Sequence, residues 1–488
     1  MFRRFNAPKK GIAALVLLSA LAGCTMIPKY KQPPANVSSS WPSVPGYAKI
    51  QTAPAAVPAA EIGWRDFFRD QRLRRVIAMA LTNNPSLRAA VENVIQTRAL
   101  YHVQQSQLVP TVGVNADNIR QRIPNIYGGN AKPLTYSEYQ VNLGAASYEL
   151  DLFGQVRSLT RQALETYFAS EEARRAAQIA LVAQVATAYL TEQEASEQLA
   201  IARQTLKAAR QSFALTKRSF QAGVESQFDL NAASAQVSTA SASVAAYAQQ
   251  LAQASDNLTL LVGRPLPPAL APAPKVDLNL CVSDIPAGLP SDLLARRPDI
   301  LEAEHQLKAA NANIGAARAA FFPTITLTAS GGYASTSLQN LIAPGSTAWG
   351  FEPQLVWPIF DLGTAFHQLQ ADKAVKEAEA ANYQSTVQTA FKEVADALAV
   401  RQTVQSQLAD NQALVTADQQ SYDLTEAGFK SGVNSTLDVL VTLQTLDSAR
   451  ENLIQVQYSR LISLIDLYQA LGGGWNEQSP QSQQTSRQ

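Results

Sequence analysis

Side chains that could catalyse a reaction or bind a metal are few in this sequence and lie far apart. The three histidines, His102, His305 and His367, lie in separate helical stretches without the spacing of metal ligands. Neither a glycine-rich phosphate loop nor a nucleophile elbow occurs in the sequence. The sequence therefore argues against an enzyme, and we expect neither a cofactor nor a metal.

Acidic side chains recur instead inside a short motif that occurs twice. Residues 218–230 read RSFQAGVESQFDL and residues 427–440 read AGFKSGVNSTLDVL. In each copy a glycine suits the left-handed residue that ends a helix, and a serine with an aspartate three residues later forms a variant capping box. The motif predicts the tips of two helical hairpins, at residues 220–229 and 429–438. The repeated residues, 209 positions apart, are Phe220, Gly223, Val224, Ser226 and Asp229 in the first tip and Phe429, Gly432, Val433, Ser435 and Asp438 in the second.

The helices that lead into the two tips carry a seven-residue apolar repeat. The same rung of the repeat is charged in both, with Glu192 in the first helix and Arg401 in the second. A strict heptad repeat predicts coiled-coil packing, and a long buried seam of a helix bundle is the alternative interpretation.

The N-terminus resembles a bacterial lipoprotein signal. A basic start and an apolar run precede the sequence Leu21-Ala22-Gly23-Cys24, which predicts a signal peptide at residues 1–23 and lipidation of Cys24. Thr25 follows where an aspartate would resemble the signal for the inner membrane, so the outer membrane is the expected location. Cys281 is the only other cysteine, which excludes an intrachain disulfide in the lipidated chain.

The charge balance gives no indication of a nucleic-acid partner. The formal net charge is +1, and removal of residues 1–23, which carry four basic residues and no acid, lowers it to −3.

Four segments have the alternating period of β-strands. They are residues 110–122 and 137–152, and then 323–335 and 349–361. No apolar run after the signal reaches the about 20 residues that a membrane helix needs, so we expect any membrane span to consist of strands. Four strands cannot close a membrane barrel, whose smallest examples have about eight, so partner chains are required. Polar residues on the inner faces would then line a wet lumen.

The order of elements repeats along the chain. Pro85 and Pro110 bracket a helix, and Pro298 and Pro323 bracket another of equal length 213 residues later. After each hairpin a long helix runs to the tip, and a shorter one returns. We expect the returning helix and the proline-bracketed helix to stack end to end beside the long one. The predicted organisation is a lipid-anchored extended linker at 24–60, a first repeat at 61–263, a connector at 264–297, a second repeat at 298–475 and a disordered tail at 476–488.

Several motifs together resemble one family. They are the signal with Cys24, the duplicated tip, the segment YELDLFG at 148–154, and the segments LARRPDI at 294–300 and AARAAFFP at 316–323. These resemble the TolC-like outer-membrane factors, in particular the outer-membrane efflux lipoproteins of the NodT type, over about residues 60–475.

The resemblance implies a mainly α fold with a membrane β-barrel. It implies a homotrimer in which a twelve-stranded β-barrel continues as a twelve-helix α-barrel across the periplasm. It also implies docking of the tips to a periplasmic adaptor protein and an inner-membrane pump, commonly of the resistance-nodulation-division type, that expels drugs and other small toxic compounds.

The resemblance also assigns site residues. Leu437 and Asp438 match ring positions of the periplasmic aperture, while Val441 and Gln444 replace the family's frequent aspartate and basic residue. The expected constriction is therefore weakly charged. The alternative for Asp438 is an ordinary cap at the positive end of a helix.

The first tip carries an acid that can tether neighbouring coils in the family. Asp229 matches that acid, but its usual tyrosine and arginine partners align with Phe429 and Asn434, and Lys430 is the possible substitute. Gly223, Ser226, Gly432 and Ser435 complete the expected turns and contacts between coils.

Two other functions remain open at this point. Type I protein secretion is the alternative to efflux of small molecules. A structural coiled-coil lipoprotein would explain the heptads, but it would not need the two alternating hairpins.

Overall fold

The computed structural model describes residues 25–47, 58–124, 133–283, 285, 290–360 and 362–479. Cys24 and the predicted signal lie outside the described residues. The chain divides into two compact units, and long helices contribute to both. Unit 1 comprises Met1–Pro33, Val94–Ser170 and Ala303–Tyr383, and unit 2 comprises Pro34–Asn93, Glu171–Glu302 and Gln384–Gln488.

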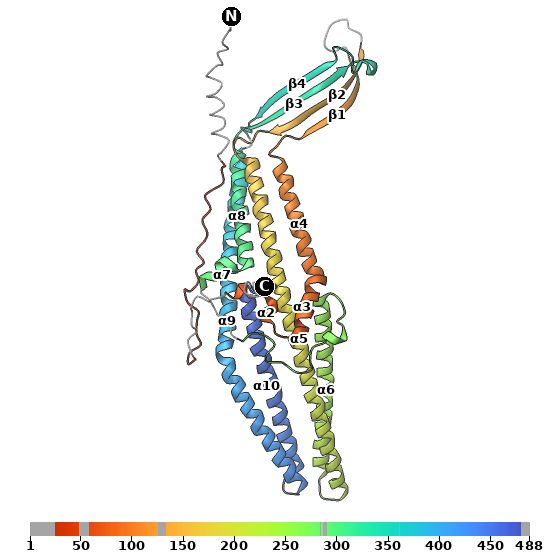
Figure 1. The fold of residues 1–488 in the computed structure, drawn as a ribbon, viewed down its shortest axis with the longest axis vertical. Helices are drawn as coiled ribbons and strands as arrows, with labels where there is room; N and C mark the ends of the chain where they lie inside the picture. The colour runs from red at the N-terminus through yellow and green to blue at the C-terminus, as the bar shows by residue number, and fades with distance from the viewer. Residues whose placement is uncertain are drawn as a thin grey trace, which may run out of the picture. The chain divides into compact units, whose positions relative to one another are not determined.

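Unit 1 contains one antiparallel sheet whose strands follow sequence order (Figure 1). The strands are β1 (Val112–Ile123), β2 (Leu134–Glu149), β3 (Thr324–Ser335) and β4 (Thr347–Val356). β2 pairs with β3, so the two repeats join in the middle of the sheet. The register of this pair shifts between Ala145 and Tyr148, where Ser147 has a positive φ of 51°. The observed strands overlap the four alternating segments, and β4 ends five residues earlier than expected.

The sheet leaves large apolar side chains exposed. Trp349 is 84% exposed, and every residue of β4 is exposed. In the described part of the chain, the outer edges of β1 and β4 have no partner strand. The four strands therefore form an open sheet rather than a closed barrel, as the number of strands in the sequence predicts.

Among the described residues, no helix is both long enough and apolar enough to cross a membrane.

Helices α4 (Pro85–Ser106), α5 (Gln155–Gln221), α8 (Pro298–Ala319) and α9 (Leu362–Lys430) contribute to unit 1. Asp151 fixes the start of α5, because its carboxylate accepts hydrogen bonds from the Val156 and Arg157 backbone N–H groups at 3.1 and 2.9 Å. Within the unit, the buried Glu165 of α5 lies 2.7 Å from Nδ1 of His305 on α8. Burial alone would raise the pKa of Glu165, but His305 and Arg161 hold it below its usual value.

The proline-rich N-terminal segment is extended, as a linker would be, but it is packed against α8. We call residues 26–32 the N-terminal strap. Arg318 donates to the Met26 carbonyl at 3.3 Å, and Asn311 donates to the Pro28 carbonyl at 2.9 Å. A Cβ atom on Gly315 would lie 2.7 Å from Cγ1 of Ile27. Since residues 311, 315 and 318 share one face of a helix, this face holds the strap.

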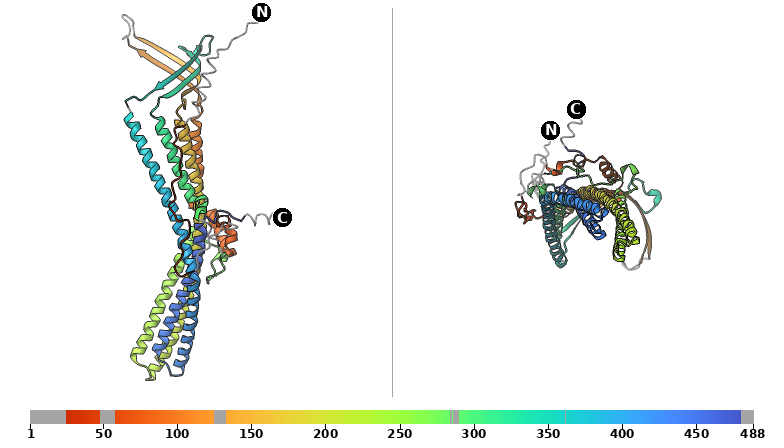
Figure 2. Two further views of the ribbon diagram at one scale, coloured as in Figure 1. Left: turned by 90° about the vertical axis from the view of Figure 1, so that its left-hand side faces the viewer. Right: turned by 90° about the horizontal axis from the view of Figure 1, so that it is seen from below.

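Unit 2 is helical, and two antiparallel hairpins, α5–α6 and α9–α10, end in tips at the same end of the unit (Figure 2). The other elements of unit 2 are η1 (Ala59–Glu61), α2 (Trp64–Phe67), α3 (Gln71–Asn83), α6 (Gln227–Val262), η2 (Pro268–Leu270), α7 (Pro290–Arg296) and α10 (Thr436–Ala470). The short helix η3 (Leu338–Asn340) belongs to unit 1. The long helices α5 and α9 have 67 and 69 residues, against 36 and 35 for α6 and α10.

An aromatic cluster closes the end of α10 within unit 2. The ring of Tyr468 stacks on Phe67 at 4.0 Å between centroids, and its hydroxyl donates to the Ile62 carbonyl at 2.6 Å. The chain after α10 packs beside this cluster, where Ser479 accepts from the Gly63 N–H at 3.0 Å and Glu477 forms an ion pair with Arg65 at 2.6 Å. Residues 477–479, at the start of the predicted tail, thus contact residues 63–66.

The returning and proline-bracketed helices meet end to end in both repeats. Asn84, immediately before α4, donates from Nδ2 to the Leu261 carbonyl near the end of α6 at 2.8 Å. Arg297, immediately before α8, donates from Nη1 to the Ala470 carbonyl at the end of α10 at 3.0 Å. We call each contact a helix splice, and both satisfy a carbonyl that a helix end leaves without a partner.

Candidate functional site

The two tips have the same backbone geometry. Gly223 and Gly432 have φ angles of 75° and 79°, the left-handed conformation expected at a helix end. The next residue, Val224 or Val433, donates its N–H back to the carbonyl five residues earlier at 2.9 or 2.8 Å. The duplicated glycine therefore closes each long helix in the same way.

A capping box starts the returning helix at each tip. The Asp229 and Ser226 side chains each bond to the other residue's N–H, at 3.1 and 3.2 Å, and Asp438 and Ser435 do the same at 2.9 and 3.2 Å. Hydrogen bonds from the serine hydroxyl and its backbone N–H lower the pKa of both carboxyls. Both aspartates are therefore ionised at neutral pH. Asp438 is exposed, and Asp229 is half-buried.

The four predicted aperture residues are exposed on α10. Leu437 and Val441 are 49% and 53% exposed, and Asp438 and Gln444 are also exposed. Spacings of four and three residues place 437, 441 and 444 on one helix face. The opposite face is buried in the protomer, through Val439, Leu440, Leu443 and Leu446. The protomer thus leaves Leu437, Asp438, Val441 and Gln444 available for a lumen or a partner.

The expected substitute latch between Lys430 and Asp229 is absent among the described contacts. Lys430 forms an ion pair with Glu426 of its own helix at 3.0 Å, and the Asp229 carboxylate binds Ser226. Phe429 is half-buried and has no hydroxyl with which to reach an acid.

A different connection joins the two tips, and the sequence motif did not indicate it. Thr436, the first residue of α10, is 1% exposed and donates its hydroxyl to Oε1 of Glu225 at 3.0 Å. Its hydroxyl also lies 3.2 Å from that of Thr216, which is fully buried on α5. We call these three residues the tip bridge.

Glu225 and Thr436 of the tip bridge stand at positions where the two motif copies differ. Asn434 stands where the first tip has Glu225, and it folds back to donate to the Thr425 carbonyl at 3.3 Å. Gly428 makes room for this, since a Cβ there would lie 2.5 Å from Nδ2 of Asn434. A comparison of the differences between the copies, rather than of their identities, would have singled out Glu225 and Thr436.

Large apolar side chains are exposed at the tips. Their exposed fractions are 81% for Val224, 70% for Phe228, 74% for Leu424 and 80% for Val433. Exposed apolar groups gathered in one place are typical of a surface that binds another protein.

The histidines lie apart, as their sequence positions indicate. His305 pairs with Glu165, whereas His102 and His367 are exposed. No group of three potential metal ligands occurs within the described ranges.

The sequence profile of the outer membrane efflux proteins matches residues 76–264 and 289–473. The chain belongs to the outer membrane efflux protein family. It is 45% identical to the toluene efflux pump outer membrane protein TtgC of Pseudomonas putida, over 98% of both chains. It is 41% identical to the outer membrane protein OprJ of Pseudomonas aeruginosa, over 96% of this chain and 97% of OprJ.

Two solved structures of membrane proteins share the fold. The open state of the MtrE outer membrane channel of Neisseria gonorrhoeae superposes with a TM-score of 0.82 at 38% identity, covering 93% of this chain and all of MtrE. A membrane protein from Pseudomonas aeruginosa gives a TM-score of 0.85 at 40% identity, covering 92% of this chain and all of its own.

These similarities confirm the family and the fold class expected from the sequence. The chain is an outer-membrane efflux protein that extends into the periplasm, and it is a transport protein rather than an enzyme.

Proposed function

We propose that three copies of this chain form the exit channel of a tripartite efflux system. An inner-membrane pump, of the resistance-nodulation-division type, and a periplasmic adaptor deliver drugs or other small toxic compounds, which then leave passively. The observation that carries this proposal is the row of exposed side chains on α10, Leu437, Val441 and Gln444, beside the anionic Asp438. One protomer leaves this row without a covering, and a ring of protomers would turn it into an aperture.

The sheet supports a trimer. Its four strands have two open edges, and three copies supply the twelve strands that a closed barrel of this family contains. The exposed apolar residues on the strands, such as Trp349 and Leu355, would then face lipid.

The tips support docking to the adaptor. Val224, Phe228 and Val433 are each at least 70% exposed and lie at the turns farthest along the hairpins. Cys24, outside the described residues, would carry the lipid that anchors the N-terminus in the outer membrane.

The transported compounds follow from the relatives and the aperture. The relative TtgC is named for toluene, a small apolar molecule, and ArpC of Pseudomonas putida, 44% identical, is named for antibiotics. An aperture of Leu437 and Val441 with one anionic ring suits neutral and cationic small molecules rather than anions.

Two measurements test this function. Purified protein in planar bilayers should conduct as a trimer with a preference for cations, and deletion of the gene should lower tolerance to toluene and antibiotics. A monomer without conductance, or unchanged tolerance to both, would refute the proposal. Mass spectrometry of the mature N-terminus tests lipidation of Cys24 independently, with Cys24→Ala as control.

A further inference from the structure

The two helix splices are equivalent in the repeats but use different residues. Asn84 and Arg297 are related by the 213-residue offset, and their acceptors at Leu261 and Ala470 by the 209-residue offset. In the first splice, the asparagine side chain bonds, among the described residues, only to those near the two helix ends, since its Oδ1 accepts from the Leu87 N–H in the first turn of α4 at 2.9 Å.

The arginine of the second splice reaches further than the asparagine. Arg297 is 7% exposed, and its Nε and Nη2 bind both carboxylate oxygens of Asp299 at 3.0 and 2.6 Å. Its Nη1 also lies 2.8 Å from Oε2 of Glu393, in the middle of α9. The position equivalent to Glu393 in α5 is Gln184, an uncharged residue. The second splice therefore clamps the long helix as well as the short one, through a planar fork with little freedom to reorient.

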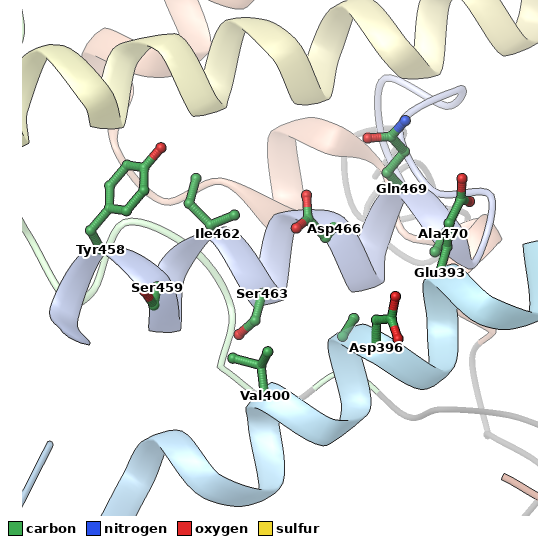
Figure 3. Close-up of a pocket in the computed structure, with 11 residues that line it drawn as sticks. Glu393, Asp396, Val400, Tyr458, Ser459, Ile462, Ser463, Asp466, Gln469 and Ala470 are labelled. Carbon is green, nitrogen blue, oxygen red and sulfur yellow. The ribbon is translucent and has the colours of Figure 1, made fainter. Parts of the chain in front are cut away.

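A groove of about 430 Å³ begins at this clamp and separates α9 from α10 (Figure 3). Glu393 and Ala470, both bound by Arg297, line its first end, and Val400 and Tyr458 line the end towards the tips. Beyond the groove, Val404 of α9 and Ile454 of α10 are buried, at 5% and 3% exposed. The groove thus lies between the two helices immediately on the tip side of the clamp.

Three carboxylates line the groove. Asp396 and Glu393 line it from α9, and Asp466 lines it from α10. Lys392 binds Asp396 at 2.5 Å, and Arg297 binds Glu393. Burial, and then the charge of Glu393, raise the pKa of Asp466 above its usual value, as expected for carboxylates that repel each other.

We propose that Arg297 is a positioning residue, the fixed point about which the second hairpin moves when the channel opens. This inference rests on the proposed channel function. The groove gives α9 and α10 room to shift, while the clamp holds them at Glu393 and Ala470. From Glu393 to the end of α9 at Lys430 is about 55 Å of helix, so a rotation of about 5° at the clamp moves the tip by about 5 Å.

Two matched variants test the pivot in the full-length trimer. Glu393→Ala removes the contact between Arg297 and α9, and Arg297 keeps Asp299 as its charge partner. Asp396→Ala removes the same charge from the same helix and the same groove without touching Arg297. Spin labels on Val400→Cys and Ser459→Cys report the width of the groove, since the native Cys281 is only 2% exposed. Thermal midpoints of both variants show whether the fold is retained.

The pivot predicts that Glu393→Ala widens the distribution of label distances and raises the frequency of channel opening about tenfold, with Asp396→Ala near the wild type. If the wild type conducts and the two variants behave alike, the pivot is refuted and the channel function stands. If the wild-type trimer does not conduct at all, the channel function fails and takes the pivot with it.

Discussion

The tip bridge makes a quantitative prediction about channel opening. If the second hairpin leaves the first on opening, the contacts of Thr436 with Glu225 and Thr216 must break. Thr436→Val keeps nearly the same shape in this buried position and removes only the hydroxyl that makes the two contacts, at 3.0 and 3.2 Å.

The size of the effect follows from the surroundings of the three side chains. The single hydroxyl proton of Thr436 goes to Glu225, and a hydrogen bond to a charged group contributes about 1.5–3 kcal/mol. Both partners recover part of this in the variant, because Glu225 is only half-buried and Thr216 keeps its bond to the Ser212 carbonyl at 3.1 Å. We therefore expect a net loss of about 1–2 kcal/mol from the closed state, which raises the equilibrium constant for opening about 5- to 30-fold.

Single-channel recording in planar bilayers measures this shift directly. The matched control is Thr442→Val on the same helix, whose hydroxyl donates to the Asp438 and Val439 carbonyls of its own helix at 2.9 and 3.2 Å. The reasoning is refuted if Thr436→Val opens no more often than Thr442→Val. A double-mutant cycle with Glu225→Gln then separates the share of the carboxylate from that of Thr216.

Three further perturbations have expected outcomes. Asp438→Ala and Asp229→Ala should each remove the carboxylate that completes a capping box and so lower the thermal midpoint, but Asp438→Ala alone should reduce cation preference in conductance measurements; equal effects on cation preference would make Asp438 only part of a cap. Gly315→Ala should cost about 1–3 kcal/mol and expose residues 26–32 to hydrogen exchange, because the new Cβ would lie 2.6 Å from Oγ of Ser158 and 2.7 Å from Cγ1 of Ile27; Gly363→Ala, in open space, is the control, and equal exchange in both would count against it. Burial raises the pKa of Glu194 from 4.5 to about 7, so the stability that its proton contributes is complete below about pH 4.5 and is lost as the pH rises through about 7; the thermal midpoint of Glu194→Gln should fall less between pH 5 and pH 8.5 than that of the wild type, and equal falls would contradict this.

The repeated elements could be predicted because each has a local cause. The alternating segments formed strands, and the S-x-x-D pattern of Ser226 and Ser435 formed a capping box at both tips. Helix lengths alone indicated the end-to-end stacking that Asn84 and Arg297 now explain. Such features depend on neighbours in the sequence or on arithmetic between repeats.

The features that escaped prediction depend on contacts between distant residues. The proline-rich composition indicated an extended linker, but it gave no sign of the hydrogen bonds that the carbonyls of this segment accept from Asn311 and Arg318 of α8. The tip bridge was not predicted because Thr216 and Thr436 are 220 residues apart, and no local pattern marks them as a pair. The substitute latch at Lys430 stays a prediction, and within the protomer Lys430 pairs with Glu426, one turn away.

The contact between the N-terminal strap and α8 constrains the residue types of α8 more than those of Met26 and Pro28 in the strap. Every amino acid has a main-chain oxygen, so natural variation can exchange residues such as Met26 and Pro28 while the strap stays attached. The side chains that grip it, Asn311 and Arg318, have no such freedom, and neither has the gap at Gly315. Related sequences should therefore vary more at Met26 and Pro28, which are held through their carbonyls, than at Asn311, Gly315 and Arg318 of α8, so an alignment would show selection acting on the binder at these two positions.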